Sequence, residues 1–136
     1  MSLVSSDAQF AIATEADMVI ARQKGREIAQ SLGFPISDQA LIATAISELT
    51  RNMLKYAGRG HLSLAVEQQP SRKAIVVTAV DNGPGIADPV LAMQDGFSSG
   101  DGLGLGLPGT RRIMDDFELE TKLGEGTRIT AKKWIR

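Results

Sequence analysis

Residues 73–86 read "KAIVVTAVDNGPGI", an apolar run that ends in an acid and a glycine- and proline-containing segment. Its first eight residues are mostly apolar and β-branched, a pattern that predicts a buried strand. The strand ends at Asp81, and Gly83, Pro84 and Gly85 follow directly. Such an ending is either an ordinary turn or the floor of a ligand site, and the stretch alone leaves both interpretations open.

The composition limits what the stretch can mean. At 136 residues the chain has the length of one domain, so we expect a single domain over 1–136, with residues 1–8 flexible. Apolar residues make up 43%, aromatic residues 4%, and the net charge is -1. These values are typical of a globular domain and lack the basic excess of a nucleic-acid binder. The absence of cysteine excludes disulfides and thiol chemistry.

Targeting signals are also lacking in the sequence. No apolar run approaches the ~20 residues of a membrane span, and the N-terminus has no charged region followed by an apolar core. We therefore expect a cytoplasmic protein that binds neither nucleic acid nor a membrane.

Three helices are predicted. The first starts at the capping-box-like "TEAD" (14–17) and ends near Gly33. The second spans 38–57, with Ser37 as its N-cap, and the third begins at Pro108, whose missing N–H costs nothing in a first turn. The second has the clearest helical period, carried by Ile42, Ile46, Leu49, Met53 and Tyr56.

Five strands accompany these helices. We expect them at 9–13, 61–68, 73–80, 117–122 and 127–134, with the last two joined by a turn at 123–126. Leu62, Leu64 and Val66 alternate onto one face of the second strand. The elements predict an α+β fold, a two-layer α/β sandwich in which helices cover one face of a mixed, mostly antiparallel sheet.

The predicted helix 38–57 carries two polar residues of interest. Glu48 and Asn52 are four residues apart, so both side chains project from the same side of the helix. By itself this pair also fits a solvated helix edge.

A glycine-rich tract precedes the third helix. Gly102, Gly104 and Gly106 alternate along "GDGLGLGLPG", and such a backbone can direct several N–H groups and a helix dipole at one anion. A flexible loop is the alternative, although the interleaved leucines favour an ordered one. A fourth element, "GEGT" at 124–127, opens the last strand.

Together, E-x-x-x-N on a helix, D-x-G-x-G after a strand, G-x-G-x-G before a helix and G-x-G-T before a strand follow an order found in one superfamily. The chain resembles the nucleotide-binding domain shared by gyrase, the heat-shock chaperones, the two-component histidine kinases and the MutL repair proteins. The resemblance covers nearly the whole chain.

This resemblance implies a role for each motif. Asn52 would ligate a Mg²⁺ that bridges the nucleotide phosphates, and Glu48 would act as general base. Asp81 would accept a hydrogen bond from the adenine amino group of ATP or ADP, with Thr127 helping to hold Asp81 and a water. The remaining nucleotide-binding residues implied are Gly83, Gly85, Ile86, Gly102, Gly104, Gly106 and Leu107, of which Gly83 and Gly85 would let the backbone approach the base.

Within the superfamily, the chain is most similar to stand-alone serine/threonine switch kinases of the RsbT type, which belong to the anti-sigma-factor kinase branch. The resemblance is carried by "SELTRNMLKYAGRG", "DGFSSGDGLGLGLPGTRRIMDDF" and "AKKWIR". It implies a kinase that phosphorylates a STAS-domain partner of the stressosome and then activates a PP2C-type phosphatase. Two alternatives stay open: an anti-sigma factor that sequesters a sigma subunit, and a nucleotide-dependent binding module without transfer activity.

Overall fold

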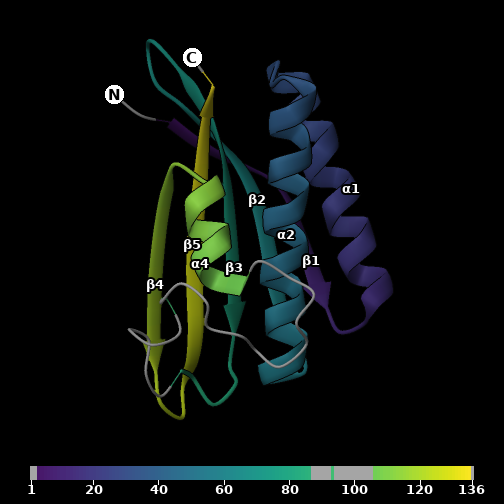
Figure 1. The fold of residues 1–136 in the computed structure, drawn as a ribbon, viewed down its shortest axis with the longest axis vertical. Coiled ribbons are helices and arrows are strands. Elements are labelled where there is room, and N and C mark those ends of the chain that lie inside the picture. The colour runs from purple at the N-terminus through teal and green to yellow at the C-terminus, as the bar shows by residue number, and fades with distance from the viewer. Residues whose placement is uncertain (1–2, 87–92, 94–105, 136) are drawn as a thin grey trace.

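The computed structural model describes residues 3–86, 93 and 106–135, with side chains described from residue 8 onward. Figure 1 shows one twisted sheet with the helices on one of its faces. The strands are β1 (Leu3–Ile12), β2 (Gly60–Gln68), β3 (Lys73–Asp81), β4 (Asp116–Lys122) and β5 (Gly126–Ile135). The helices are α1 (Glu15–Leu32), α2 (Ile36–Ala57) and α4 (Gly106–Ile113).

The sheet has the strand order β1-β2-β3-β5-β4. Every pairing among the described strands is antiparallel, so the described part of the sheet lacks the parallel pairs that a mixed sheet would contain. The predicted two-layer α+β architecture is confirmed. Strand β1 is longer than the predicted 9–13 because it pairs with β2 from Leu3 onward, across an irregularity between Ser6 and Ala8.

Helix α1 begins and ends as its sequence predicts. Thr14 is the N-cap: its hydroxyl accepts from the Asp17 N–H, and the Asp17 carboxylate accepts from the Thr14 and Ala13 N–H groups. These backbone hydrogen bonds, that of Ala13 first, lower the pKa of Asp17. Gly33 ends the helix in the left-handed conformation.

Helices α2 and α4 both begin earlier than predicted. The prediction of Ser37 as N-cap is wrong, because Pro35 holds that position and its carbonyl accepts the first helical hydrogen bond, from Gln39. Helix α4 begins at Gly106. Pro108 therefore lies inside the first turn, where its missing N–H still removes no helical hydrogen bond.

The core lies between the helices and the sheet. The apolar stripe of α2 is buried as predicted at Ile42, Ile46, Leu49 and Met53, but Tyr56 is 48% exposed. From the sheet, Leu62 and Leu64 are fully buried and Val66 partly so. None of the described helices is both long enough and apolar enough to cross a membrane.

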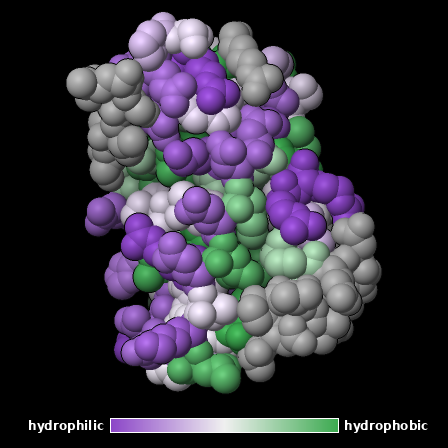
Figure 2. Space-filling view, turned by 90° about the vertical axis from the view of Figure 1, so that its left-hand side faces the viewer, coloured by the Kyte–Doolittle hydropathy of each residue, from purple (hydrophilic) through white to green (hydrophobic). Residues whose placement is uncertain are grey.

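Strand β4 forms one edge of the sheet. The side of the molecule that carries this edge, on the left in Figure 1, shows apolar side chains bordered by polar ones (Figure 2). Glu118 and Glu120 are exposed, whereas Phe117 and Leu119 are partly buried against the core. Exposed charges on an edge strand oppose pairing with another chain.

Candidate nucleotide site

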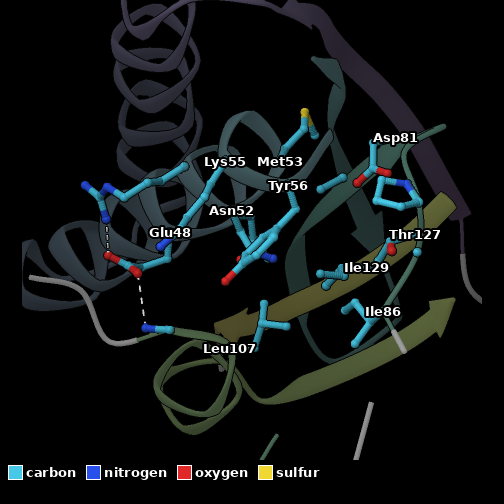
Figure 3. A pocket seen from close by; sticks show the side chains of 16 residues that line it. Glu48, Asn52, Met53, Lys55, Tyr56, Asp81, Ile86, Leu107, Thr127 and Ile129 are labelled. Atoms are coloured by element: carbon cyan, nitrogen blue, oxygen red, sulfur yellow. Dashed lines mark hydrogen bonds and ion pairs between the residues drawn. The ribbon is translucent and has the colours of Figure 1, made fainter. Parts of the chain in front are cut away.

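A pocket of about 220 Å³ opens where α2, the end of β3, the start of β5 and the start of α4 meet. Figure 3 shows Asn52 and Tyr56 of α2 on one side, with Ile86, Leu107 and Ile129 opposite them. Four motifs that are far apart in the sequence thus supply one cavity. Its lining includes Glu48, Asn52, Asp81, Gly85, Ile86, Gly106, Leu107 and Thr127 among the predicted site residues.

Glu48 joins α2 to the start of α4. One carboxylate oxygen forms an ion pair with Arg51 of the same helix, and the other accepts the Gly106 N–H at 3.1 Å. The Glu48 side chain is only 10% exposed. A carboxylate at this helix N-terminus is stabilised by the unpaired N–H groups there.

Asn52 lies one turn after Glu48 and also lines the pocket. Among the described residues, no hydrogen bond fixes its side-chain amide, so the amide oxygen is available to a ligand. Carboxylate and amide oxygens are hard donors of the kind that Mg²⁺ takes, usually together with phosphate oxygens and waters. The donor set at this end of the pocket therefore fits a magnesium nucleotide.

Asp81 lies at the other end of the pocket, at the end of β3. One of its carboxylate oxygens accepts the Gly83 N–H at 2.9 Å, which closes a tight turn and fixes the side chain. The second oxygen accepts no hydrogen bond from the residues that the structure describes. Asp81 thus offers one fixed acceptor to a ligand in the pocket.

The glycines of the turn are needed for packing between protein elements. A side chain at Gly83 would place its Cβ 2.6 Å from the Cβ of Ala57 in α2. At Gly85, where φ is +78°, the Cβ would lie 2.5 Å from the Lys122 carbonyl oxygen. The turn is therefore held between α2 and the β4–β5 hairpin. Gly83 does not line the pocket itself, whereas Gly85 does.

A threonine pair braces the turn from the hairpin side. Thr127 is the register partner of Asp81 across β3 and β5, and its hydroxyl lies 3.0 Å from that of Thr121. The Thr121 hydroxyl also accepts the Ile86 N–H at 2.8 Å. Sequence reasoning missed Thr121, because only the pairing of β4 with β5 places it beside the turn.

The pocket wall contains further residues that the sequence analysis did not select. Met53, Tyr56, Pro84 and Ile129 add apolar surface. Lys55 also lines the pocket, with its ammonium 5.6 Å from the centre of the Tyr56 ring. An aromatic ring at a cavity mouth can stack on a planar ligand. No signal in the sequence singled out Tyr56, because it follows the helical period of the core residues.

Two predicted phosphate-binding residues, Gly102 and Gly104, lie outside the described residues. Gly106 and Leu107, which complete that motif, are the first residues of α4 and line the pocket. The described part of the glycine tract therefore meets the E-x-x-x-N motif, as the sequence predicts.

Residues 37–135 match the model of the histidine kinase-, DNA gyrase B- and HSP90-like ATPase family. The chain belongs to this family.

Two proteins of known function are similar to this chain in sequence. The chain is 51% identical over 125 residues to the serine/threonine-protein kinase RsbT of Bacillus subtilis (strain 168), covering 92% of this chain and 94% of that one. It is 29% identical over 104 residues to an anti-sigma F factor of Thermoanaerobacter sp. (strain X514), covering 74% and 73%.

A solved structure has the same fold. The crystal structure of the RsbU and RsbW domains of a Mycobacterium tuberculosis protein superposes with a TM-score of 0.63 at 18% identity, covering 98% of this chain and 32% of that one. At this identity the likeness concerns the fold alone.

Proposed function

We propose that the chain is an ATP-dependent serine/threonine kinase that phosphorylates a STAS-domain partner in a partner-switching pathway. The observation that carries the proposal is one pocket lined by Glu48, Asn52 and the start of α4, where Glu48 accepts the Gly106 N–H. The kinase class is supported by 51% identity to a serine/threonine-protein kinase over almost the full length of both chains. The anti-sigma-factor relative supports a role in partner switching.

The described residues divide into two groups along the pocket. Asp81, Gly85, Ile86 and Thr127 gather at the end of β3, where a carboxylate acceptor beside apolar surface suits the amino edge and ring faces of adenine. The start of α4 lies at the other end, where the N–H groups of a helix N-terminus suit phosphate oxygens. We assign ATP and ADP to the pocket in this orientation.

Asn52 is assigned to hold Mg²⁺ through its amide oxygen. When bound, the ion neutralises charge on the phosphate oxygens during transfer. The described residues contain no cluster of three His, Asp or Glu side chains that would hold a metal by themselves. One protein oxygen completed by phosphates and waters is the usual arrangement for Mg²⁺.

Glu48 is assigned as the general base. The partner's Ser or Thr oxygen forms a bond to the γ-phosphorus, the bond from that phosphorus to the β,γ-bridging oxygen breaks, and ADP leaves. The hydroxyl proton passes to the Glu48 carboxylate. Its position beside α4 brings the base next to the helix terminus assigned to the phosphates, as proton transfer requires.

The identity of the partner is tested with γ-labelled ATP and three candidates from the same genome: a STAS-domain protein, a sigma factor and a PP2C-type phosphatase. We expect label on the STAS protein, and binding of the phosphatase once that protein has been phosphorylated. Stable capture of the sigma factor would favour the anti-sigma function. Nucleotide binding without label on any protein would favour a binding module.

The residue roles are tested with two variants. Glu48→Ala should still bind Mg-ADP and transfer phosphate about 10²–10⁴-fold more slowly. Asn52→Ala should lose the dependence of nucleotide affinity on Mg²⁺, which calorimetry with and without the ion measures. Unchanged transfer by Glu48→Ala would remove it from the base role.

A further inference from the structure

The two contacts of the Glu48 carboxylate differ in kind. One joins it to the guanidinium of Arg51, three residues further along α2, and the other joins it to the backbone N–H of Gly106, 58 residues further along the chain. Figure 3 draws both contacts as dashed lines. Among the described residues, each carboxylate oxygen therefore has one partner.

The Gly106 N–H that Glu48 accepts is a hydrogen-bond donor that could also bind a phosphate oxygen. The first N–H groups of a helix have no acceptor within the helix and attract anions. In this structure the anion at Gly106 is Glu48 itself. A nucleotide phosphate bound at the start of α4 would compete for that N–H, and of the two contacts Glu48 would then keep the one with Arg51.

Arg51 differs from an ordinary partner on a helix surface. The i,i+3 pair Lys24–Glu27 on α1 has both side chains about half exposed, at 44% and 57%, and its charged atoms are 3.9 Å apart. In the Arg51–Glu48 pair the arginine is 43% exposed, but the glutamate is only 10% exposed. The carboxylate is thus largely withdrawn from water, and one charge-assisted hydrogen bond from the guanidinium holds one of its oxygens.

We propose that Arg51 is a positioning residue that holds the Glu48 carboxylate toward the reacting hydroxyl once phosphate occupies the Gly106 N–H. This rests on the proposed role of Glu48 as general base. Arg51 acts through Glu48 and makes no contact with the nucleotide in this role. Its removal therefore lowers the rate of transfer and leaves nucleotide affinity unchanged.

The test compares Arg51→Ala with Arg51→Lys and with Lys24→Ala, a control that removes a similarly exposed cation from an i,i+3 pair on α1, away from the pocket. Transfer to the STAS-domain protein and hydrolysis of ATP by water are both measured. We expect Arg51→Ala to lower kcat about 10- to 100-fold, with KM for ATP and ADP affinity within about twofold. Arg51→Lys should recover part of the rate, and Lys24→Ala should match the wild type.

A double-mutant cycle shows whether Arg51 acts through Glu48. In the Glu48→Ala background, Arg51→Ala should change the rate by less than about twofold. A further loss there would overturn the inference, because Arg51 would then act on the phosphate itself. The inference would also be overturned if Arg51→Ala had the wild-type rate, or if Arg51→Ala raised KM without lowering kcat.

The cycle also separates this inference from the function on which it rests. A fully active Glu48→Ala variant, or a wild-type protein that neither transfers phosphate nor hydrolyses ATP, would overturn the proposed function and the role of Arg51 with it. A slow Glu48→Ala variant beside a fully active Arg51→Ala variant would overturn the Arg51 inference alone. Thermal unfolding of each variant controls for folding, because the rates are compared only among variants that remain folded at the assay temperature.

Discussion

Replacement of Gly126 by alanine should damage both the fold and the nucleotide site. Gly126 opens β5 with φ at +119°, and a Cβ there would lie 2.0 Å from the Asp81 carbonyl oxygen and 2.9 Å from the Cα of Asn82. Both contacts are with backbone, so no side chain can rotate away. The end of β3 must move, and Asp81 moves with it.

Two contributions set the expected loss in free energy of unfolding. A non-glycine residue in this backbone conformation costs about 1–3 kcal/mol, and forcing an extra carbon into packed backbone costs about another 1–3 kcal/mol. We expect Gly126→Ala to lower the free energy of unfolding by roughly 4 kcal/mol. For a domain of this size that corresponds to a fall in Tm of the order of 15 °C.

Gly124 provides the matched control. It lies two residues earlier in the same hairpin, also at positive φ (+79°), but a Cβ there meets nothing within 4 Å. Gly124→Ala therefore bears the conformational cost alone, about 1–2 kcal/mol.

Urea unfolding and calorimetric titration with ADP measure the two effects. Gly126→Ala should bind ADP at least about 10-fold more weakly, a loss of about 1.4 kcal/mol, while Gly124→Ala should keep the wild-type affinity. Equal destabilisation by the two alanines, or unchanged ADP affinity in Gly126→Ala, would refute the reasoning from close packing.

Three further changes test other contacts. Asp81→Asn should weaken ADP binding, because an amide donor can face the adenine amino group where an acceptor is needed; unchanged affinity in calorimetry would remove Asp81 from the adenine site. Thr121→Val should cost about 1–3 kcal/mol in urea unfolding, because it leaves the Ile86 N–H without its acceptor; a neutral effect would contradict the bracing role. Asp17→Asn should lower Tm at neutral pH and have less effect as the pH falls. The folded state lowers the pKa of Asp17, so its stabilisation is present above the unfolded pKa of about 3.9 and is lost as the pH falls through the lower folded value. A difference in Tm that stays constant from pH 7 to pH 2 would contradict this cause.

Local signals predicted most of the secondary structure. Thr14 and Gly33 bound α1 as their capping patterns indicate, because a cap is formed by residues a few positions apart. The alternation of Leu62 and Leu64 identified the buried face of β2. The prediction at Ser37 was wrong because serine favours an N-cap in isolation, whereas Pro35 has the N-cap backbone angles and opens α2 two residues earlier.

The sequence also identified several residues of the pocket. Glu48, Asn52, Asp81 and Thr127 lie in short motifs whose order is specific, and all four line one cavity. The positions of these motifs along the chain do not give the distances between them in space. Those distances depend on the order of the strands in the sheet and on how the helices pack.

Tertiary structure alone decided the contacts that join the motifs. The Gly106 N–H reaches Glu48 because α4 packs beside α2, and Thr121 reaches Ile86 because β4 pairs with β5 in one register. Tyr56 follows the helical period of the core residues, but it is half-exposed and lines the pocket. A sequence pattern records which face of an element is apolar, whereas the partner of each polar side chain depends on which other element packs against that face.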